Sequence, residues 1–281
     1  MSAIGHSVFS RSYRSVLPGF RLSMGFTLFY LASLVLIPLL ALVLRPFEMS
    51  LADMWDAIGS PRTLAALRLS FGMSLAAALI DAVFGLIIAW VLVRYRFPGK
   101  GLLDALIDLP FALPTAVAGI ALSTLYAPNG WIGSILVEYG IKIAYTPWGV
   151  LVAMTFIALP FTVRTIQPVM AELGRDSEEV AATLGATRLQ IIGKVVLPAL
   201  LPAILTGVAL AFARAAGEFG SIIFIAGNLP NISEIAPLLI IIKLEEFDYA
   251  GAAFIGVAML MASFVMLLAL NWLQSWAAKR R

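Results

Sequence analysis

Two oppositely charged residues lie four positions apart inside an apolar stretch. Arg214 and Glu218 fall on one face if the stretch is a helix, so their charges can neutralise each other. Ionisable groups inside a bilayer are costly and usually line a path for polar solutes. The pair is therefore predicted to be either a structural ion pair or part of a path or gate, since an anion needs cations or donors along its route. Gly217 and Gly220 flank Glu218 and predict the close approach of a neighbouring helix or, alternatively, a hinge.

Other candidates for a polar path lie in further apolar stretches. Asp81 and Asp108 carry carboxylates, and Asp108 is followed by Pro110 and Pro114. Prolines remove backbone hydrogen bonds, and the freed carbonyls must find partners in lipid. The two prolines therefore predict a kink that either faces a pore or only packs against a neighbour. Arg164 lies near the end of its stretch and is either a further candidate for the path or a residue that extends toward the lipid headgroups.

Motifs for catalysis are missing from the sequence. It has no GxxxxGK(S/T) phosphate loop, no HExxH, no GxSxG and no cysteine, and its single histidine, His6, lies in a polar N-terminal tail. We therefore predict no catalytic residue, no metal site and no bound cofactor. An ATPase in its own right is excluded, and an intramembrane hydrolase is not supported.

The longest polar stretch, EEVAATLGATRLQIIGKVVLP at 178–198, lies between two strongly apolar blocks. Gly185 can take the positive φ that closes a helix, and Pro198 predicts the end of a second helix. Two pairs of residues have the spacing of a capping box, Asp176 with Glu179 and Thr187 with Gln190. Each pair predicts the start of a short helix.

The first of these helices, about 177–184, is too short to be stable alone in water and must pack against something. One of its faces carries the apolar or small residues Val180, Ala181 and Leu184. Its N-terminal end carries the negative charges of Glu178 and Glu179. One interpretation is a hairpin that rests on headgroups or on the protein's own spans. The other is a knob that inserts into a groove on a partner.

The composition decides which elements position these residues. A chain of 281 residues with mean hydropathy +0.98 and 12% charged residues has more apolar surface than one soluble domain can bury. The apolar residues form long blocks instead of alternating, which favours helices over a barrel. The predicted fold is an all-α membrane protein with six transmembrane helices, near 26–44, 68–93, 103–126, 148–170, 200–226 and 250–273.

The basic residues predict the orientation of these spans. Twelve Lys and Arg residues lie in the two termini and in the second and fourth connections between the predicted spans. The first, third and fifth connections contain only four. This asymmetry places both termini in the cytoplasm, and the net charge of +3 reflects it, so no nucleic-acid partner is expected. The first span is too long for a signal peptide. The predicted organisation is a cytoplasmic tail at 1–25, a transmembrane domain at 26–273 with its core at about 64–273 and a cytoplasmic loop at 171–198, and a basic cytoplasmic tail at 274–281.

The polar loop resembles the signature loop of ABC importer permeases. The matching positions are Glu179, Val180, Ala181, Gly185, Val195, Leu197 and Pro198, of which Val180 and Val195 are apolar replacements for the family's usual Ala and Ile. The resemblance implies that the loop forms a cytoplasmic coupling helix that docks into a groove on a separate ATP-hydrolysing subunit. The implied coupling residues are Glu178, Glu179, Val180, Ala181, Leu184, Gly185, Leu197 and Pro198.

A second resemblance covers nearly the whole chain, to the T-type membrane subunits of bacterial sulfate/thiosulfate importers. It rests on VLPGF (16–20), RYRFPGK (94–100), LLDALIDLPFALPTAVAG (102–119), VRTIQPV (163–169), GEFGSIIFIAGN (217–228) and EFDY (246–249). It implies a multi-pass inner-membrane permease of the type I ABC importer architecture, with five core helices and a peripheral first span.

The same resemblance implies partners. These are a second homologous permease, two ATPase copies that carry ATP and Mg, and a periplasmic sulfate- or thiosulfate-binding protein. Molybdate and tungstate permeases share part of the Gly-Glu-Phe-Gly region and are the alternative. An ion-coupled secondary anion carrier would instead use Asp81, Asp108 and Glu218 as a relay, although the six spans show no evident inverted repeat.

Overall fold

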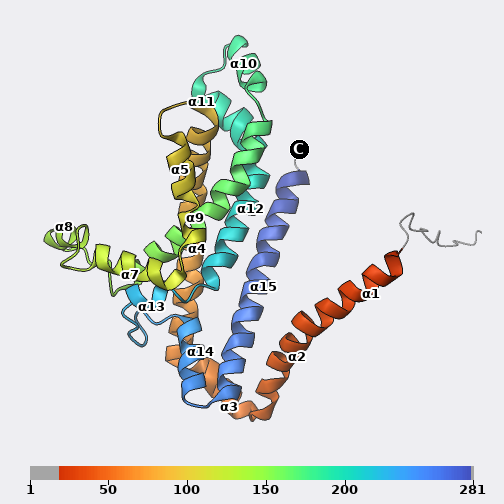
Figure 1. Ribbon diagram of the computed structural model, residues 1–281, viewed down its shortest axis with the longest axis vertical. Coiled ribbons are helices and arrows are strands. Elements are labelled where there is room, and N and C mark those ends of the chain that lie inside the picture. Colours follow the sequence, from red (N-terminus) through yellow and green to blue (C-terminus); the bar gives the residue numbers. More distant parts are fainter. Residues whose placement is uncertain (1–18, 280–281) are drawn as a thin grey trace, which may run out of the picture.

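The computed structural model describes residues 19–279, and over this range every regular element is a helix (Figure 1). Five helices are long and apolar enough to cross a membrane, namely Leu22–Glu48, Pro61–Arg94, Pro147–Glu172, Arg188–Ala216 and Tyr249–Ser275. The prediction of an all-α membrane protein is confirmed. The count of six spans and the orientation stay predictions.

Three long helices form the core, α4 (Pro61–Arg94), α9 (Pro147–Glu172) and α12 (Leu197–Ala216). They pack on one another through small residues, which let the backbones approach closely. A Cβ atom added at Gly85 would lie 2.8 Å from Cγ2 of Thr162, and one added at Gly207 would lie 3.2 Å from Cα of Thr162. Thr162 of α9 is therefore enclosed by α4 and α12.

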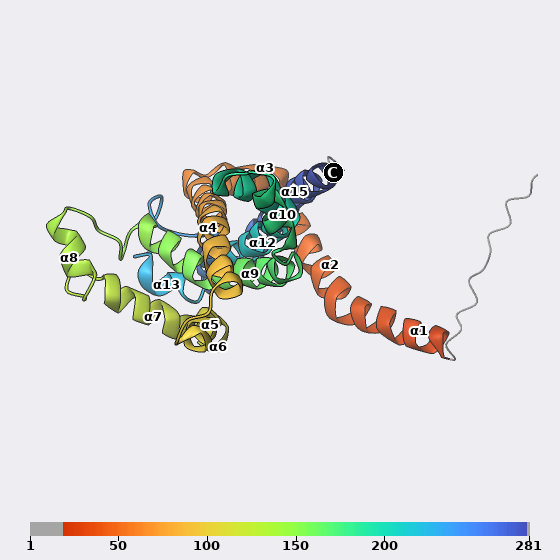
Figure 2. The same ribbon diagram turned by 90° about the horizontal axis from the view of Figure 1, so that it is seen from above.

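The prediction of one helix over 103–126 is wrong, because the chain here forms three pieces. These are α5 (Lys100–Ile107), α6 (Leu109–Ala112) and α7 (Thr115–Tyr126). Pro110 lies in the first turn of α6, and Leu113 is extended because a residue before proline avoids helical angles. The prolines thus break the span instead of kinking it. α7 then runs sideways from the body toward α8 (Gly133–Glu138) (Figures 1 and 2).

The fifth predicted span, 200–226, begins earlier and ends earlier than expected. α11 (Arg188–Ile191) continues through the π-helical η3 (Ile192–Val196) into α12, so the prediction that Pro198 ends a helix is wrong. Pro198 falls in the first turn of α12, directly after the wider π turn, where the missing N–H is tolerated. α12 ends at Ala216, and α13 (Ile222–Ile225) is a separate short helix.

The remaining helices surround this core. α15 (Tyr249–Lys279) packs on α12 and on α14 (Ala236–Glu245), and α3 (Leu51–Gly59) packs on α4 and α15. The short helices α3, α8 and α14 were not predicted. The basic stretch predicted as a tail at 274–281 begins as the last turns of α15.

The first predicted span is a helical rod that leaves the body. It consists of α1 (Phe20–Leu31), η1 (Ala32–Leu36), α2 (Ile37–Leu44) and η2 (Arg45–Glu48). Its second half, α2 and η2, packs on α15, and none of the residues in its most apolar window is buried (Figure 2). His6 and most of the predicted tail at 1–25 lie outside the described residues.

Replacing Gly85 by leucine is expected to destabilise the protein by about 1–3 kcal/mol, the usual cost of inserting atoms into a packed core. Thr162 cannot withdraw, because Gly207 lies on its other side. Gly72→Leu is the matched control, since Gly72 lies on the same helix and has open space where the Cβ would go. Thermal melting in detergent compares the two variants, and equal melting temperatures would contradict the packing.

Candidate functional site

The polar loop forms the two short helices that the sequence predicts. α10 spans Asp176–Thr183, and Gly185 after it has φ +84. The second capping box is confirmed, since the Gln190 N–H donates to the Thr187 hydroxyl (3.4 Å) and the Thr187 N–H donates to the Gln190 side chain (2.8 Å).

The first predicted capping box, Asp176 with Glu179, is wrong. Arg175 occupies the N-cap position of α10 and makes no side-chain cap, so Asp176 already lies in the first turn. Three acidic residues in that turn, Asp176, Glu178 and Glu179, still favour the helix through its dipole.

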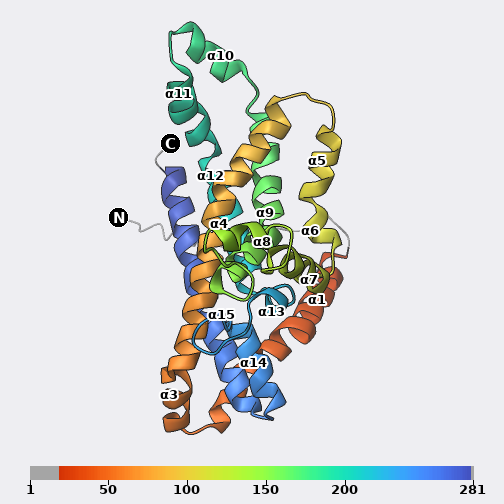
Figure 3. The same ribbon diagram turned by 90° about the vertical axis from the view of Figure 1, so that its left-hand side faces the viewer.

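α10 lies beyond the ends of the spans and is tied back to α4 (Figure 3). The Glu178 carboxylate pairs with the Arg94 guanidinium at 2.5 Å, and Arg175 donates to the backbone carbonyl of Arg94 at 2.6 Å. Arg94 is the last residue of α4. The hairpin is therefore fixed to α4 by side chains and to α12 by the continuous helix from α11.

Three apolar residues of the hairpin remain exposed, although Ile191 packs against the core. Val180 is 59% exposed, and Leu184 and Leu189 are each 83% exposed. α10 itself contacts α11 and η3. Exposed apolar side chains that share one tip are typical of a surface that a partner covers. Of the other predicted coupling residues, Glu179 is exposed, Ala181 is half-buried, and Leu197 and Pro198 are exposed at the start of α12.

A polar cluster lies at the opposite end of α12. The predicted pair of Arg214 and Glu218 is confirmed at 2.5 Å, but Glu218 lies beyond the end of the helix at Ala216. Glu218 is only 2% exposed. Its other oxygen accepts from the backbone N–H (2.9 Å) and hydroxyl (3.0 Å) of Ser221. The carboxylate is thus both neutralised and hydrogen-bonded, which a buried charge requires.

The segment around Glu218 packs closely on α7. A Cβ atom at Gly220 would lie 2.2 Å from Oγ1 of Thr115, and one at Gly119 would lie 2.3 Å from the carbonyl oxygen of Ser221. The predicted close approach at Gly220 is confirmed, whereas Gly217 has no such contact. The segment 217–221 therefore joins the end of α12 to the first turns of α7.

Arg164 joins α9 to the broken span, and its extension toward the lipid headgroups stays a prediction. Its guanidinium donates to Asp108 at 2.8 and 2.5 Å, to Asp104 at 2.7 Å and to Gln167 at 2.7 Å. Asp108 lies at the junction of α5 and α6, where the helical backbone is interrupted. Beyond this break Pro110 is half-buried and Pro114 is exposed.

Asp81 is fully buried in α4, at 0% exposure, and neither of its carboxylate oxygens has a hydrogen-bond partner. No described basic residue forms an ion pair with it. The structure therefore does not join Asp81 to the Arg214 cluster.

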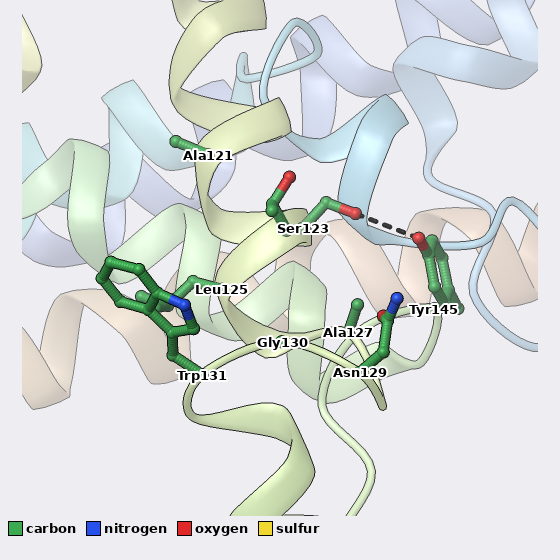
Figure 4. Close-up of a pocket in the computed structure, with 9 residues that line it drawn as sticks. Ala121, Ser123, Leu125, Ala127, Asn129, Gly130, Trp131 and Tyr145 are labelled. Carbon is green, nitrogen blue, oxygen red and sulfur yellow. Dashed lines mark hydrogen bonds between the residues drawn. The ribbon is translucent and has the colours of Figure 1, made fainter.

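A cavity of about 580 Å³ lies at the far end of α7 (Figure 4). The residues around it are Ala121, Ser123, Thr124, Leu125, Ala127, Asn129, Gly130, Trp131 and Tyr145. The Ser123 hydroxyl donates to the Tyr145 phenol oxygen at 3.3 Å. None of these residues is a carboxylate, and several are neutral donors. Such a lining can hydrogen-bond an oxyanion without a fixed counter-charge.

Tyr145 is held over this cavity in a strained conformation. Its φ is +63, which is rare for an aromatic residue. Its N–H donates to the carbonyl of Ile225 at 2.6 Å, and Gly227 leaves room for its backbone. Sequence reasoning missed this cavity because Tyr145 and the α7 donors share no motif or helical face.

The comparisons with known proteins agree with this architecture. Residues 81–281 match the family model described as "Binding-protein-dependent transport system inner membrane component". The chain belongs to this family. It is 51% identical to the "Sulfate transport system permease protein CysT" of Salmonella typhimurium over 269 residues, covering 96% of this chain and 97% of that one. It is 50% identical to the protein of the same name from Escherichia coli over 273 residues, covering 97% and 99%.

Solved ABC importers share the fold at lower identity. The chain superposes on a subunit of a bacterial ABC transporter that imports alginate with a TM-score of 0.74 at 16% identity, covering 92% of this chain and 96% of that one. The MetNI methionine ABC transporter matches with a TM-score of 0.59 at 17% identity, covering 82% and 99%. The chain is thus an inner-membrane protein with the helical architecture of ABC importer permeases.

Replacing Glu218 by alanine is expected to destabilise the protein by about 1–3 kcal/mol, because Arg214 and the buried Ser221 N–H would lose their acceptor. Glu245→Ala is the control, since Glu245 is exposed and has no ion pair among the described residues. Thermal melting of both purified variants in detergent tests this. If Glu218→Ala melts with the control, the cluster does not hold α12 to α7.

Proposed function

We propose that this chain is a permease subunit of an ABC importer that carries sulfate, and also thiosulfate, into the cytoplasm. The observation that carries the proposal is the identity of about half of all residues with sulfate transport permeases, over nearly the whole length of both chains. Accumulating a dianion inside the cell requires an energy source. This sequence contains no phosphate loop that would bind ATP. The chain is therefore a non-catalytic subunit, and ATP and Mg bind to a separate ATPase dimer.

The geometry supports a coupling role for the α10–α11 hairpin. Its exposed Val180, Leu184 and Leu189 would enter a groove on the ATPase, in the helix-in-groove mode. A movement of α10 would pass to α4 through the Glu178–Arg94 pair and to α12 through the continuous helix. This proposal places the hairpin and both termini in the cytoplasm.

The opposite end of α12 supports a role in the anion path. Arg214 is partly exposed, and Glu218 and Ser221 hold it next to α7. The cavity beside Tyr145 adds neutral hydrogen-bond donors. Several weak contacts with the anion suit transport, because the anion must bind in the path and also be released from it. A second, homologous permease would complete the pore, and a periplasmic binding protein would deliver the anion to it.

The coupling role predicts that Glu179→Arg and Gly185→Asp abolish transport and loosen the ATPase without affecting membrane insertion. The first reverses a charge on the exposed hairpin, and the second strains a residue at φ +84. Co-purification of the ATPase with each variant is the measurement. Arg96→Gln, a change at an exposed residue outside the hairpin, is the control. Normal co-purification of both hairpin variants would refute the coupling role.

The path predicts that Arg214→Gln and Tyr145→Phe each lower sulfate uptake several-fold with the complex still assembled. Glutamine keeps a donor for Glu218 but removes the positive charge, and phenylalanine removes only the phenol oxygen. Lys142→Gln is the control, since Lys142 is an exposed cation without an ion pair among the described residues. Labelled sulfate is measured in proteoliposomes with the partner subunits, binding protein outside and ATP inside. Wild-type uptake in both variants would remove these residues from the path.

The same proteoliposomes test the function itself. ATP-dependent sulfate uptake that resists excess molybdate is expected. Displacement by molybdate would reassign the substrate, and uptake driven by a proton gradient without ATP would instead make the chain a secondary carrier.

A further inference from the structure

A separate cavity of about 340 Å³ lies where the end of α4 meets the α10–α11 hairpin. Its lining contains three guanidinium groups, from Arg94, Arg175 and Arg188, together with the ring of Trp90. The exposed apolar residues that the coupling role places in a partner's groove, Val180, Leu184 and Leu189, are not among its lining residues, whereas the coupling residues Glu178 and Glu179 are.

Arg94 lines this cavity and has an unused donor. Its side chain is only 8% exposed, its guanidinium lies 5.8 Å from the centre of the Trp90 ring, and one of its terminal nitrogens pairs with Glu178. Its Nε atom is buried and has no hydrogen-bond partner. A buried N–H without an acceptor is costly, so a further acceptor at the end of α4 would stabilise this arrangement.

The other charges of the cavity leave a positive excess. Arg175 uses one nitrogen on the Arg94 carbonyl, and neither Arg175 nor Arg188 forms an ion pair among residues 19–279. Two carboxylates also line the cavity, Glu178, which is already paired with Arg94, and the exposed Glu179. The remaining donors suit a group with several anionic oxygens, because guanidinium groups bind phosphate oxygens with two donors at once.

The position of the cavity indicates where such a group would come from. Arg94 is the last residue of a membrane-spanning helix, Trp90 lies one turn inside it, and Tyr95 follows it. Trp and Tyr concentrate at the level of lipid headgroups, and basic residues next to a span attract anionic lipids. We propose that this cavity binds the phosphate group of an anionic phospholipid, which braces the attachment of the hairpin to α4.

The test uses the full-length chain, extracted into detergent from vesicles of equal parts phosphatidylglycerol and phosphatidylcholine. Lipid mass spectrometry then gives the ratio of the two lipids retained on the protein. The wild type is expected to retain phosphatidylglycerol preferentially. Arg175→Gln with Arg188→Gln is expected to reduce this preference roughly thirtyfold, that is about fivefold for each of the two basic residues removed. Arg94 is left intact because its ion pair with Glu178 still fixes the hairpin to α4 when the hydrogen bond from Arg175 is lost.

Arg96→Gln is the matched control, since Arg96 is exposed two residues beyond Arg94 and does not line the cavity. It is expected to keep the wild-type preference, and an unchanged melting temperature of the double variant shows that it is folded. An undiminished preference for phosphatidylglycerol in the folded double variant would overturn the proposal. Release of the lipid by inorganic phosphate would also overturn it, because the cavity would then bind a soluble oxyanion.

Discussion

The structure depends on the close packing of three helices around Thr162. Gly85 of α4 and Gly207 of α12 both leave space that this threonine fills, and the Thr162 hydroxyl donates to the Gly207 carbonyl at 3.4 Å. In a bilayer the hydrophobic effect drives helices together only weakly, because lipid tails are as apolar as leucine. Small residues replace it with close van der Waals contact. The result is a rigid core to which the polar segments at both ends are attached.

The two ends of α12 show how this core connects distant segments. One end continues without a break into the hairpin that the Glu178–Arg94 pair fixes to α4. The other end leads into the segment 217–221, which the Arg214–Glu218 pair and two glycine contacts fix to α7. At 20 residues, α12 spans roughly 30 Å between them. The hairpin and the broken span are thus joined to opposite ends of the same helical segment.

Sequence reasoning succeeded where the signal was local. The Thr187–Gln190 capping box, the positive φ of Gly185 and the pairing of Arg214 with Glu218 each involve residues within four positions. It failed where an apolar stretch of the same length can form either one continuous helix or several short ones. A block of apolar residues at 103–126 is long enough for one span, and its length could not show that Pro110 and Pro114 divide it into three pieces. Pro198 was read as a helix end, although a π turn accommodates it.

The sequence by itself determined that this is an all-helical membrane protein, where its polar hairpin lies and which family it resembles. Hydropathy and capping depend on residue types and short spacings, which the sequence contains. Only the tertiary structure decided which charges far apart in the sequence pair, because Arg94 and Glu178 are 84 positions apart and Arg164 and Asp108 are 56 apart. It also decided that α7 turns sideways and that donors from α7 and Tyr145 share a cavity. These features result from helix packing, which brings together side chains that have no relation along the chain.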